Sequence, residues 1–216
     1  MMAVSVKICG INSPEAMAAA VKGGAGLVGF NFYPPSPRFL SLDDAAALAK
    51  LAPKGVRRVG VFVDEPDEVI ARTLDAVPLD MLQFHGNETP ERVIEARARF
   101  DRPVIKAVKI AGSDDLNEAR AHEDAADMLL FDAKPPLDMA GALPGGNALA
   151  FDWDIIAGQT WARSWMLSGG LDAANLAQAV DTSGAALVDV SSGVESAPGC
   201  KDPVLIRAFL DLANRL

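Results

Sequence analysis

Short β-like runs alternate with helical segments along the whole of this chain, and this alternation restricts the possible fold more than any other feature. Eight runs are rich in apolar and β-branched residues, at 4–10, 26–32, 57–64, 80–86, 103–110, 127–134, 164–170 and 186–193. Apolar residues at helical spacing occur at 14–24, 42–52, 66–77, 89–100, 114–125, 172–180 and 202–216, with a weaker candidate at 152–158. Successive runs begin roughly 20–37 residues apart, which is the size of a βα repeat.

Eight βα repeats with no Gly/Ser-rich linker between them predict an α/β fold with a single domain, a closed (β/α)8 TIM barrel formed by residues 1–216. The alternative is an open, doubly wound sheet. That fold generally has fewer strands at this length and a glycine-rich first turn. The turn after the first run reads KICGINS and lacks this pattern, so the barrel is favoured.

The composition excludes several classes of protein. Half of the 216 residues are hydrophobic, which is enough for a large core without disulfides or metals. The two cysteines form no disulfide framework, the start of the chain has no signal-peptide pattern, and no apolar run approaches the roughly 20 residues that span a bilayer. A net charge of -9 disfavours nucleic-acid binding. We therefore expect a cytoplasmic protein that binds neither nucleic acid nor membrane, although an anionic small molecule remains possible.

Side chains alternate along each strand, and this predicts which of them meet inside the barrel. In the first run, Val4, Val6 and Ile8 share one face, whereas Lys7 and Cys9 lie on the opposite, polar face. The apolar faces suit packing against the ring of helices. The polar faces then point into the barrel near the carboxyl ends of the strands, where barrel enzymes carry their chemistry. The residues expected to converge there are Lys7, Cys9, Gln83, His85, Asp132, Asp189 and Ser191.

Cys9 and Asp132 are the candidate catalytic residues of this polar set. Cys9 ends the first strand and is either a buried structural thiol or a reactive one, which would act as a nucleophile or as a general base. Asp132 ends the apolar run MLLFD. It is either an ordinary aspartate of a βα loop or a partly desolvated carboxyl group, and desolvation favours the protonated form that a general acid requires.

Arg38 lies in the segment FYPPSPRFLS after the second strand, where three prolines stiffen the loop. Stiffening reduces the entropy lost when the side chain is fixed. A guanidinium group held in this way suits bidentate binding of a carboxylate. The simpler interpretation, an arginine on a solvated loop, remains open from the sequence.

Two loops offer backbone N–H groups for a phosphate. Gly169 and Gly170 follow the seventh strand, and Ser191, Ser192 and Gly193 follow the eighth. Loops at these two positions often bind phosphate in this fold, and the serine hydroxyl groups add further donors. Either motif alone is weak evidence, but their occurrence together predicts a phosphate-binding site.

Other residues carry less functional information. Cys9, His85 and Asp132 match no ligand spacing of a known metal motif, so we expect no metal. His122 lies in a charged helical segment, and we expect it to be solvated. We expect packing roles for the three tryptophans of the chain, Trp153, Trp161 and Trp165.

Nearly the whole chain resembles the phosphoribosylanthranilate isomerase family of tryptophan biosynthesis. The matching segments occur in the family's order from residue 7 to residue 202: KICGINSPEAM, GFNFYPPSPRFLS, VGVFVD, LQFHGNETPE, IKAV, LLFDAK, FDW, LSGGL and VDVSSGVESAPGCKD. The combination of KICG, SPR, QFHG and DVSSGVE is specific, whereas any one of them alone is not. One departure is visible, since a GGTG-like turn before FDW is replaced here by residues 144–148, PGGNA.

The resemblance implies a (β/α)8 barrel that catalyses an Amadori rearrangement without a cofactor, and it assigns residue roles. By this resemblance, Cys9 is the general base, Asp132 the general acid and Arg38 the residue that binds the anthranilate carboxylate. The remaining residues are assigned as substrate contacts (Lys7, Gln83, His85 and Asp189) and as a phosphate site (Gly169, Gly170, Ser191, Ser192 and Gly193). The expected partner is a small phosphorylated substrate, and the family includes monomers and homodimers.

Two other functions remain possible at this point. A related sugar-phosphate isomerase would perform the same type of chemistry, but such enzymes generally use two aspartates, and the first strand here ends in Cys9. A barrel that binds a phosphate ligand without turnover would not need the Cys9 and Asp132 pair.

Overall fold

In the computed structural model, which describes residues 4–136, 138–139 and 141–216, eight parallel strands close into a barrel in the order β1 to β8. The strands are Ser5–Cys9 (β1), Leu27–Asn31 (β2), Arg57–Phe62 (β3), Met81–Phe84 (β4), Val104–Ile110 (β5), Met128–Ala133 (β6), Ser164–Leu167 (β7) and Leu187–Val190 (β8). The first and last strands pair directly, with Lys7 opposite Asp189. The predicted (β/α)8 barrel is therefore confirmed.

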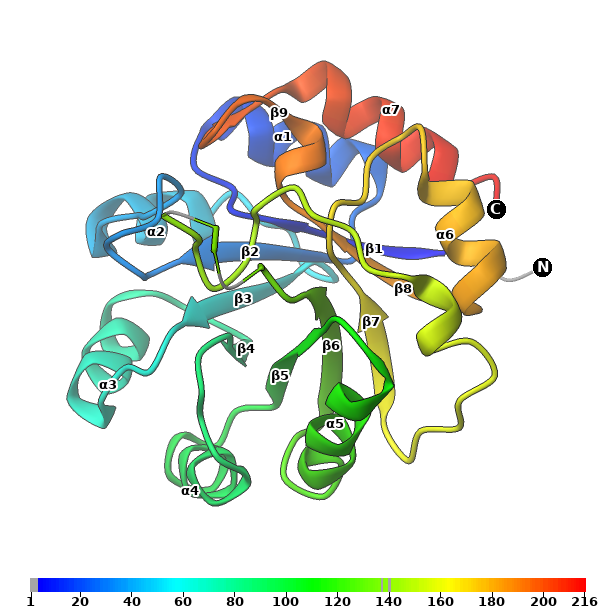
Figure 1. The fold of residues 1–216 in the computed structure, drawn as a ribbon. Helices are drawn as coiled ribbons and strands as arrows, with labels where there is room; N and C mark the ends of the chain where they lie inside the picture. Colours follow the sequence, from blue (N-terminus) through cyan, green and yellow to red (C-terminus); the bar gives the residue numbers. More distant parts are fainter. Residues whose placement is uncertain (1–3, 137, 140) are drawn as a thin grey trace.

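Helices surround the barrel on its outer side, as the view in Figure 1 shows. They are Pro14–Gly23 (α1), Leu42–Ala49 (α2), Asp67–Ala76 (α3), Pro90–Phe100 (α4), Leu116–His122 (α5), Leu176–Ser183 (α6) and Pro203–Ala213 (α7). Several begin at a side-chain cap followed by proline. Ser13 accepts a hydrogen bond from the backbone N–H of Ala16, and Thr89 accepts one from that of Arg92.

Two hydrophobic layers follow from the alternation of side chains along the strands. The larger layer lies between the strands and the helices and includes Val6, Ile8 and Phe30. A smaller cluster fills the interior of the barrel, and its buried members are Leu27, Val59, Met81, Ile105, Ala107, Met128, Leu130 and Met166. Towards the carboxyl ends of the strands, the inward positions become polar. The apolar interior thus forms a floor beneath the polar end of the barrel.

Two predicted helices differ in the structure. The segment 152–158 forms only a 3-10 turn, Trp153–Ile155 (η2), and Gly158 then adopts a left-handed conformation with φ of 67°. α6 begins at Leu176 rather than at residue 172, because the Asp172 carboxylate accepts backbone hydrogen bonds from Ala174 and Asn175 and holds a turn there. Two further 3-10 turns are Ser113–Asp115 (η1) and Ser192–Val194 (η3).

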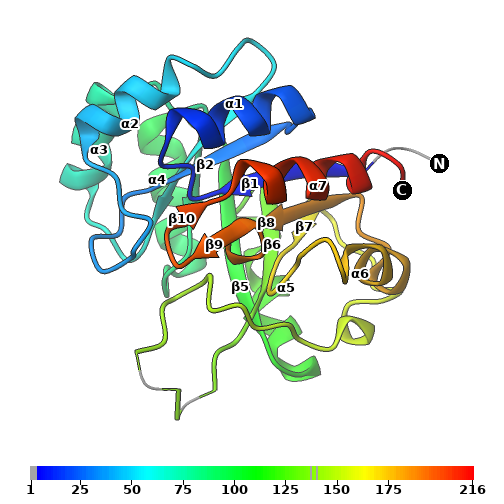
Figure 2. The same cartoon turned by 90° about the horizontal axis from the view of Figure 1, so that it is seen from above.

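A small antiparallel hairpin after β8 was not predicted. It consists of Glu195–Ala197 (β9) and Cys200–Lys201 (β10), and its strands pair only with each other. Figure 2 shows the hairpin and the segment after β6 at the same end of the molecule. Strands of three and two residues carry no periodic pattern that a sequence could reveal.

His122 was wrongly predicted to be solvated. It is 3% exposed, and its two ring nitrogens lie 2.9 Å from the carbonyl oxygen of Glu118 and 3.1 Å from that of Glu88. α5 ends at this residue, and the side chain turns inward to the loop after β4 rather than outward to solvent.

The tryptophans pack as predicted, with the Phe131 ring centroid 4.9 Å from that of Trp161 and 5.6 Å from that of Trp165. Among the described residues, no helix is long and apolar enough to cross a membrane.

Candidate active site

A pocket opens at the carboxyl ends of the barrel strands. It is lined by residues of seven strands or the loops after them, all except β5, together with the segment 143–147. Of the residues singled out from the sequence, it contains Cys9, Arg38, His85, Asp132, Gly169, Gly170, Asp189, Ser191 and Ser192. Lys7 and Gln83 do not line the pocket, but each is fully buried and contacts a residue that does. Lys7 donates to Asp189, and Gln83 contacts His85. Gly193 also lies outside the lining.

Cys9 lies beside a buried ion pair. The Lys7 ammonium group donates a hydrogen bond of 2.8 Å to Oδ1 of Asp189, and Lys7 is 0% exposed. Both side chains come from the inner faces of paired strands, β1 and β8. A side chain on Gly29 would come within 3.0 Å of the Cys9 sulfur and 3.2 Å of the Lys7 nitrogen, so this glycine leaves the space in which the two groups meet.

Some features around Cys9 favour the neutral thiol and others favour the thiolate. Burial raises the pKa of the Cys9 thiol above its ordinary value, and the nearby Asp189 carboxylate raises it further, whereas the Lys7 charge lowers it. Burial lowers the pKa of Lys7, but the attraction to Asp189 and Cys9 outweighs this, so its pKa lies above the ordinary value. Lys7 therefore remains a cation next to the sulfur.

A chain of hydrogen bonds connects Gln83, His85 and Asp132. Nε2 of Gln83 lies 2.9 Å from Nδ1 of His85, and Nε2 of His85 lies 3.0 Å from Oδ2 of Asp132. The other carboxylate oxygen of Asp132 accepts a hydrogen bond from the backbone N–H of Ala133. All three side chains are buried. The hydrogen bond with His85 therefore holds the Asp132 carboxyl group in a fixed position at the pocket wall.

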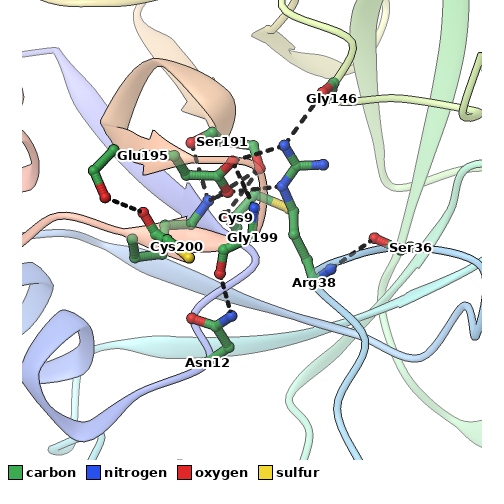
Figure 3. Close-up of polar contacts among 11 residues, drawn as sticks. Cys9, Asn12, Ser36, Arg38, Gly146, Ser191, Glu195, Gly199 and Cys200 are labelled. Carbon is green, nitrogen blue, oxygen red and sulfur yellow. Dashed lines mark hydrogen bonds and ion pairs between the residues drawn. The ribbon is translucent and has the colours of Figure 1, made fainter.

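Arg38 is not the solvated loop residue of the simpler interpretation, since it is 5% exposed. Its Nε and Nη2 atoms donate hydrogen bonds of 2.8 and 2.9 Å to the two carboxylate oxygens of Glu195. Nη2 also donates to the carbonyl oxygen of Gly146 at 3.2 Å. One edge of the guanidinium group is therefore held by Glu195, and Figure 3 shows the contacts of Arg38 with Glu195 and Gly146. Nη1 lies close to Gly146, since a Cβ atom there would come within 2.6 Å of it.

Glu195 and Lys201 belong to the unpredicted hairpin and were missed by the sequence reasoning. The Lys201 ammonium group binds Oε1 of Glu195 and donates hydrogen bonds to the carbonyl oxygen and the hydroxyl group of Ser191, at 3.0 and 3.2 Å. The Ser191 hydroxyl group donates to the carbonyl oxygen of Cys9 at 3.2 Å. Both residues stand in the segment GVESAPGCKD, so the available signal was two charged residues close to the proposed phosphate loop.

The loop after β7 has backbone conformations that glycine adopts easily, and the loop after β8 packs closely against it. Gly169 and Gly170 have φ of 87° and 61°, and a side chain on either would come within 2.8 Å of backbone atoms of Ala133 or Leu149. Within the described residues, neither of their N–H groups donates a hydrogen bond. A Cβ atom at Gly193 would overlap the carbonyl oxygen of Leu171, so this glycine allows the two loops to pack together.

The segment 143–147 lies directly over the polar residues. Asn147 holds it through two hydrogen bonds to the backbone of Leu143. A side chain on Gly145 would come within 2.8 Å of His85 and Asp132, and one on Gly146 within 2.6 Å of Nη1 of Arg38. The atypical PGGNA sequence therefore provides two glycines where the chain crosses close to these side chains.

A search among the described residues finds no group of three or more His, Cys, Asp and Glu side chains arranged to hold a metal ion. The arrangement instead combines a thiol beside a lysine, a carboxyl group hydrogen-bonded to an imidazole ring, a buried guanidinium group and glycine-rich loops. These groups can move protons and bind an anionic molecule.

Comparisons with known proteins agree on one family. The model of the family described as N-(5'-phosphoribosyl)anthranilate (PRA) isomerase matches residues 6–212. The N-(5'-phosphoribosyl)anthranilate isomerase of Rhodospirillum centenum is 59% identical over 215 residues, which cover 100% of both chains.

Two solved structures are similar over their whole length. The phosphoribosyl anthranilate isomerase from Thermotoga maritima has a TM-score of 0.88 at 38% identity, covering 99% of this chain and 100% of the other. A phosphoribosyl anthranilate isomerase in complex with reduced 1-(o-carboxyphenylamino)-1-deoxyribulose 5-phosphate has a TM-score of 0.82 at 35% identity, with the same coverage.

Proposed function

The chain belongs to the N-(5'-phosphoribosyl)anthranilate isomerase family, and on this premise we propose that Cys9 is the general base and Asp132 the general acid of its reaction. The enzyme converts phosphoribosylanthranilate into 1-(2-carboxyphenylamino)-1-deoxyribulose 5-phosphate in tryptophan biosynthesis. The observation that carries the assignment is that both side chains line one pocket at the carboxyl ends of the strands, Cys9 beside a cation and Asp132 beside His85.

The proposed reaction moves protons without net oxidation. The protonated Asp132 gives its proton to the ring oxygen of the ribose, the bond between this oxygen and C1 breaks, and the nitrogen lone pair forms an iminium ion. Cys9 then removes the proton at C2, and the electrons of the C–H bond form the C1–C2 double bond of an enolamine. Addition of a proton at C1 and loss of the O2 proton give the ketone. The iminium nitrogen accepts the electrons, so we propose that no metal or coenzyme takes part.

Lys7 supports the base in this proposal. Since burial raises the pKa of the Cys9 thiol, a nearby cation is needed to favour the thiolate during proton removal. Lys7 supplies this charge from beneath the pocket, and Asp189 fixes its position. His85 fixes the position of the Asp132 carboxyl group by a hydrogen bond, and Gln83 orients the imidazole ring from the other side.

The two anionic ends of the substrate require two binding regions. We assign the anthranilate carboxylate to the free edge of Arg38, because a guanidinium group already fixed at its opposite edge loses little freedom on binding. We assign the phosphate group to the loops that contain Gly169, Gly170, Ser191, Ser192 and Gly193, where unpaired N–H groups and hydroxyl groups gather. The carboxylate then has to replace the carbonyl oxygen of Gly146 as the partner of Nη2.

Three further properties are the location of the enzyme, its domain organisation and its oligomeric state. We propose that the enzyme acts in the cytoplasm as one catalytic domain over residues 1–216. We further propose that it works as a monomer or a homodimer, since a related enzyme from Thermotoga maritima is described as dimeric.

The test of the acid and base is a turnover assay with phosphoribosylanthranilate, followed by its anthranilate-type fluorescence. Cys9→Ala and Asp132→Asn are each expected to lower kcat by at least about 10²-fold, the lower end for a positioned acid or base. Cys200→Ala is the matched control, since this second cysteine is exposed and should leave kcat within about twofold. Retention of near-wild-type kcat in both site variants would refute the mechanism.

Arg38→Met tests the carboxylate assignment in the same assay. We expect it to raise KM while changing kcat much less, because uniform binding of substrate and transition state is lost. A fall in kcat at unchanged KM would contradict a binding role.

A further inference from the structure

We propose that Glu195 is a positioning residue that couples the two substrate-binding regions, holding Arg38 for the carboxylate end and, through Lys201, the loop of Ser191 for the phosphate end. This inference rests on the proposed assignment of Arg38 and of the phosphate loops. Glu195 itself does not line the pocket, so it acts through its two cationic partners.

The Glu195 carboxylate is fully used by hydrogen-bond donors. Oε1 accepts from Nε of Arg38 and from the Lys201 ammonium group, and Oε2 accepts from Nη2 of Arg38 at 2.9 Å and from the backbone N–H of Gly199 at 3.2 Å. Its side chain is 3% exposed. A carboxylate with four donors has a fixed position, and the bidentate geometry fixes the plane of the Arg38 guanidinium group with it.

The second branch leads to the proposed phosphate loop and the base. The Lys201 side chain is 0% exposed and joins Glu195 to both oxygens of Ser191. Ser191 in turn donates its hydroxyl hydrogen bond to the carbonyl oxygen of Cys9. Figure 3 shows Glu195 of the hairpin close to Arg38 of the loop after β2, with Ser191 and Cys9 beside them. Glu195 therefore contacts the loop after β2 directly, and it reaches the end of β1 indirectly, through Lys201 and Ser191.

Charge explains why this position needs a carboxylate and not another acceptor. Burial lowers the pKa of Lys201, and the Glu195 carboxylate opposes this, so Glu195 favours the cationic form of Lys201 beside Arg38. A glutamine would keep only one acceptor oxygen and would place an NH2 group against donors, so Arg38 and Lys201 would repel each other without compensation. We expect both side chains to move apart and both ends of the site to lose their geometry.

The experiment measures the two ends separately with two probes, anthranilate and inorganic phosphate, as competitive inhibitors of turnover. Arg38→Met is expected to raise the inhibition constant of anthranilate alone, and Lys201→Met that of phosphate alone. Glu195→Gln is expected to raise both constants by about tenfold or more, as loss of a charged hydrogen-bond network does. A role in folding alone would lower the midpoint of thermal unfolding and leave both constants unchanged.

Glu195→Asp keeps the inference testable if the glutamine variant does not fold. It retains the charge but is one methylene group shorter, so it cannot reach both cations, and we expect smaller increases of both constants than for glutamine. An increase for one probe only, or for neither, in Glu195→Asp and in any folded Glu195→Gln would overturn the coupling. If Arg38→Met leaves the anthranilate constant unchanged, the carboxylate assignment itself fails, and the coupling fails with it.

Discussion

Lys7 and Lys106 are both completely buried, and each binds a carboxylate, but they lie on opposite sides of the sheet. Lys7 donates to Asp189 at 2.8 Å on the inner side, next to Cys9. Lys106 donates to Glu88 at 2.9 Å on the outer side, where its neighbours along β5, Val104 and Val108, pack in the layer beneath the helices. Distance and burial are almost the same in the two pairs.

Their surroundings differ. The Glu88 carboxylate also accepts backbone hydrogen bonds from Asp64 and Gly86, and Lys106 donates to the carbonyl oxygen of Gly86, so the outer pair joins the loops after β3 and β4. The inner pair has the Cys9 thiol as its neighbour. Burial and ion pairing alone therefore do not identify a functional lysine, whereas a position beside a reactive group does.

The largest effect expected from this comparison is on stability. Glu88→Gln should lower the free energy of unfolding by about 3–5 kcal/mol, because it leaves the Lys106 charge buried without a charged partner. Urea denaturation measures this loss. The pH profile of kcat/KM should stay at that of the wild type, since this pair does not contact Cys9.

Glu68→Gln is the matched control for that measurement. Glu68 is an exposed residue of α3, and its loss should change the free energy of unfolding by no more than about 0.5 kcal/mol. If the two variants are equally stable, the outer pair does not contribute to the fold as described.

Lys7→Met should have the converse effect, on catalysis more than on stability. Removal of the cation raises the pKa of the Cys9 thiol further, so the acid limb of the kcat/KM profile moves to higher pH. At neutral pH we expect kcat/KM to fall by about tenfold, less than after removal of the base itself. Lys106→Met provides the control, with an unchanged profile. An unmoved acid limb in Lys7→Met would show that Lys7 does not support the base.

The sequence alone predicted much of this inner arrangement but none of the outer pair. The alternation of residues along β1 and β8 was sufficient to place Lys7, Cys9 and Asp189 together on the inner side, because the side of each residue follows from strand periodicity. The ion pair of Lys7 with Asp189 was not predicted. The same periodicity places Lys106 among apolar neighbours facing the helices, where a lysine is not expected. Its partner Glu88 lies in a loop, and loops carry no comparable period.

The hairpin was missed for a similar reason. Glu195 and Lys201 stand at the ends of strands too short to be recognised, and Arg38, the partner of Glu195, is more than 150 positions away in sequence. The burial of His122 likewise depends on the loop of Glu88 lying next to α5. In each case the residue contacts a segment that is distant in sequence. Such a contact forms only when the barrel closes, so no local sequence pattern predicts it.

A smaller effect of opposite sign is expected at the inner carboxylate. Asp189 raises the pKa of the Cys9 thiol, so Asp189→Asn should move the acid limb of the kcat/KM profile to lower pH, opposite to Lys7→Met. The profile is measured at a temperature at which the variant is folded, because this substitution also weakens a buried pair. Movement of both acid limbs in one direction would mean that the substitutions act through general disruption and not through charge.

The smallest expected effect concerns the dependence of stability on pH. It extends the comparison to the buried cluster of Glu195, Arg38 and Lys201. Burial raises the pKa of Glu195, but the hydrogen bond from Arg38 and the charge of Lys201 outweigh it, so its pKa lies below the ordinary value of 4.5. A carboxyl group with a lowered pKa in the folded state stabilises the protein above its unfolded-state pKa, and this contribution is lost as the pH falls through the folded-state pKa. The stability difference between wild type and Glu195→Gln should therefore be constant near neutral pH and narrow below about pH 4.5. Denaturation in urea across this range measures the difference, and a gap that stays constant down to the acid transition would mean that the Glu195 charge does not stabilise the cluster.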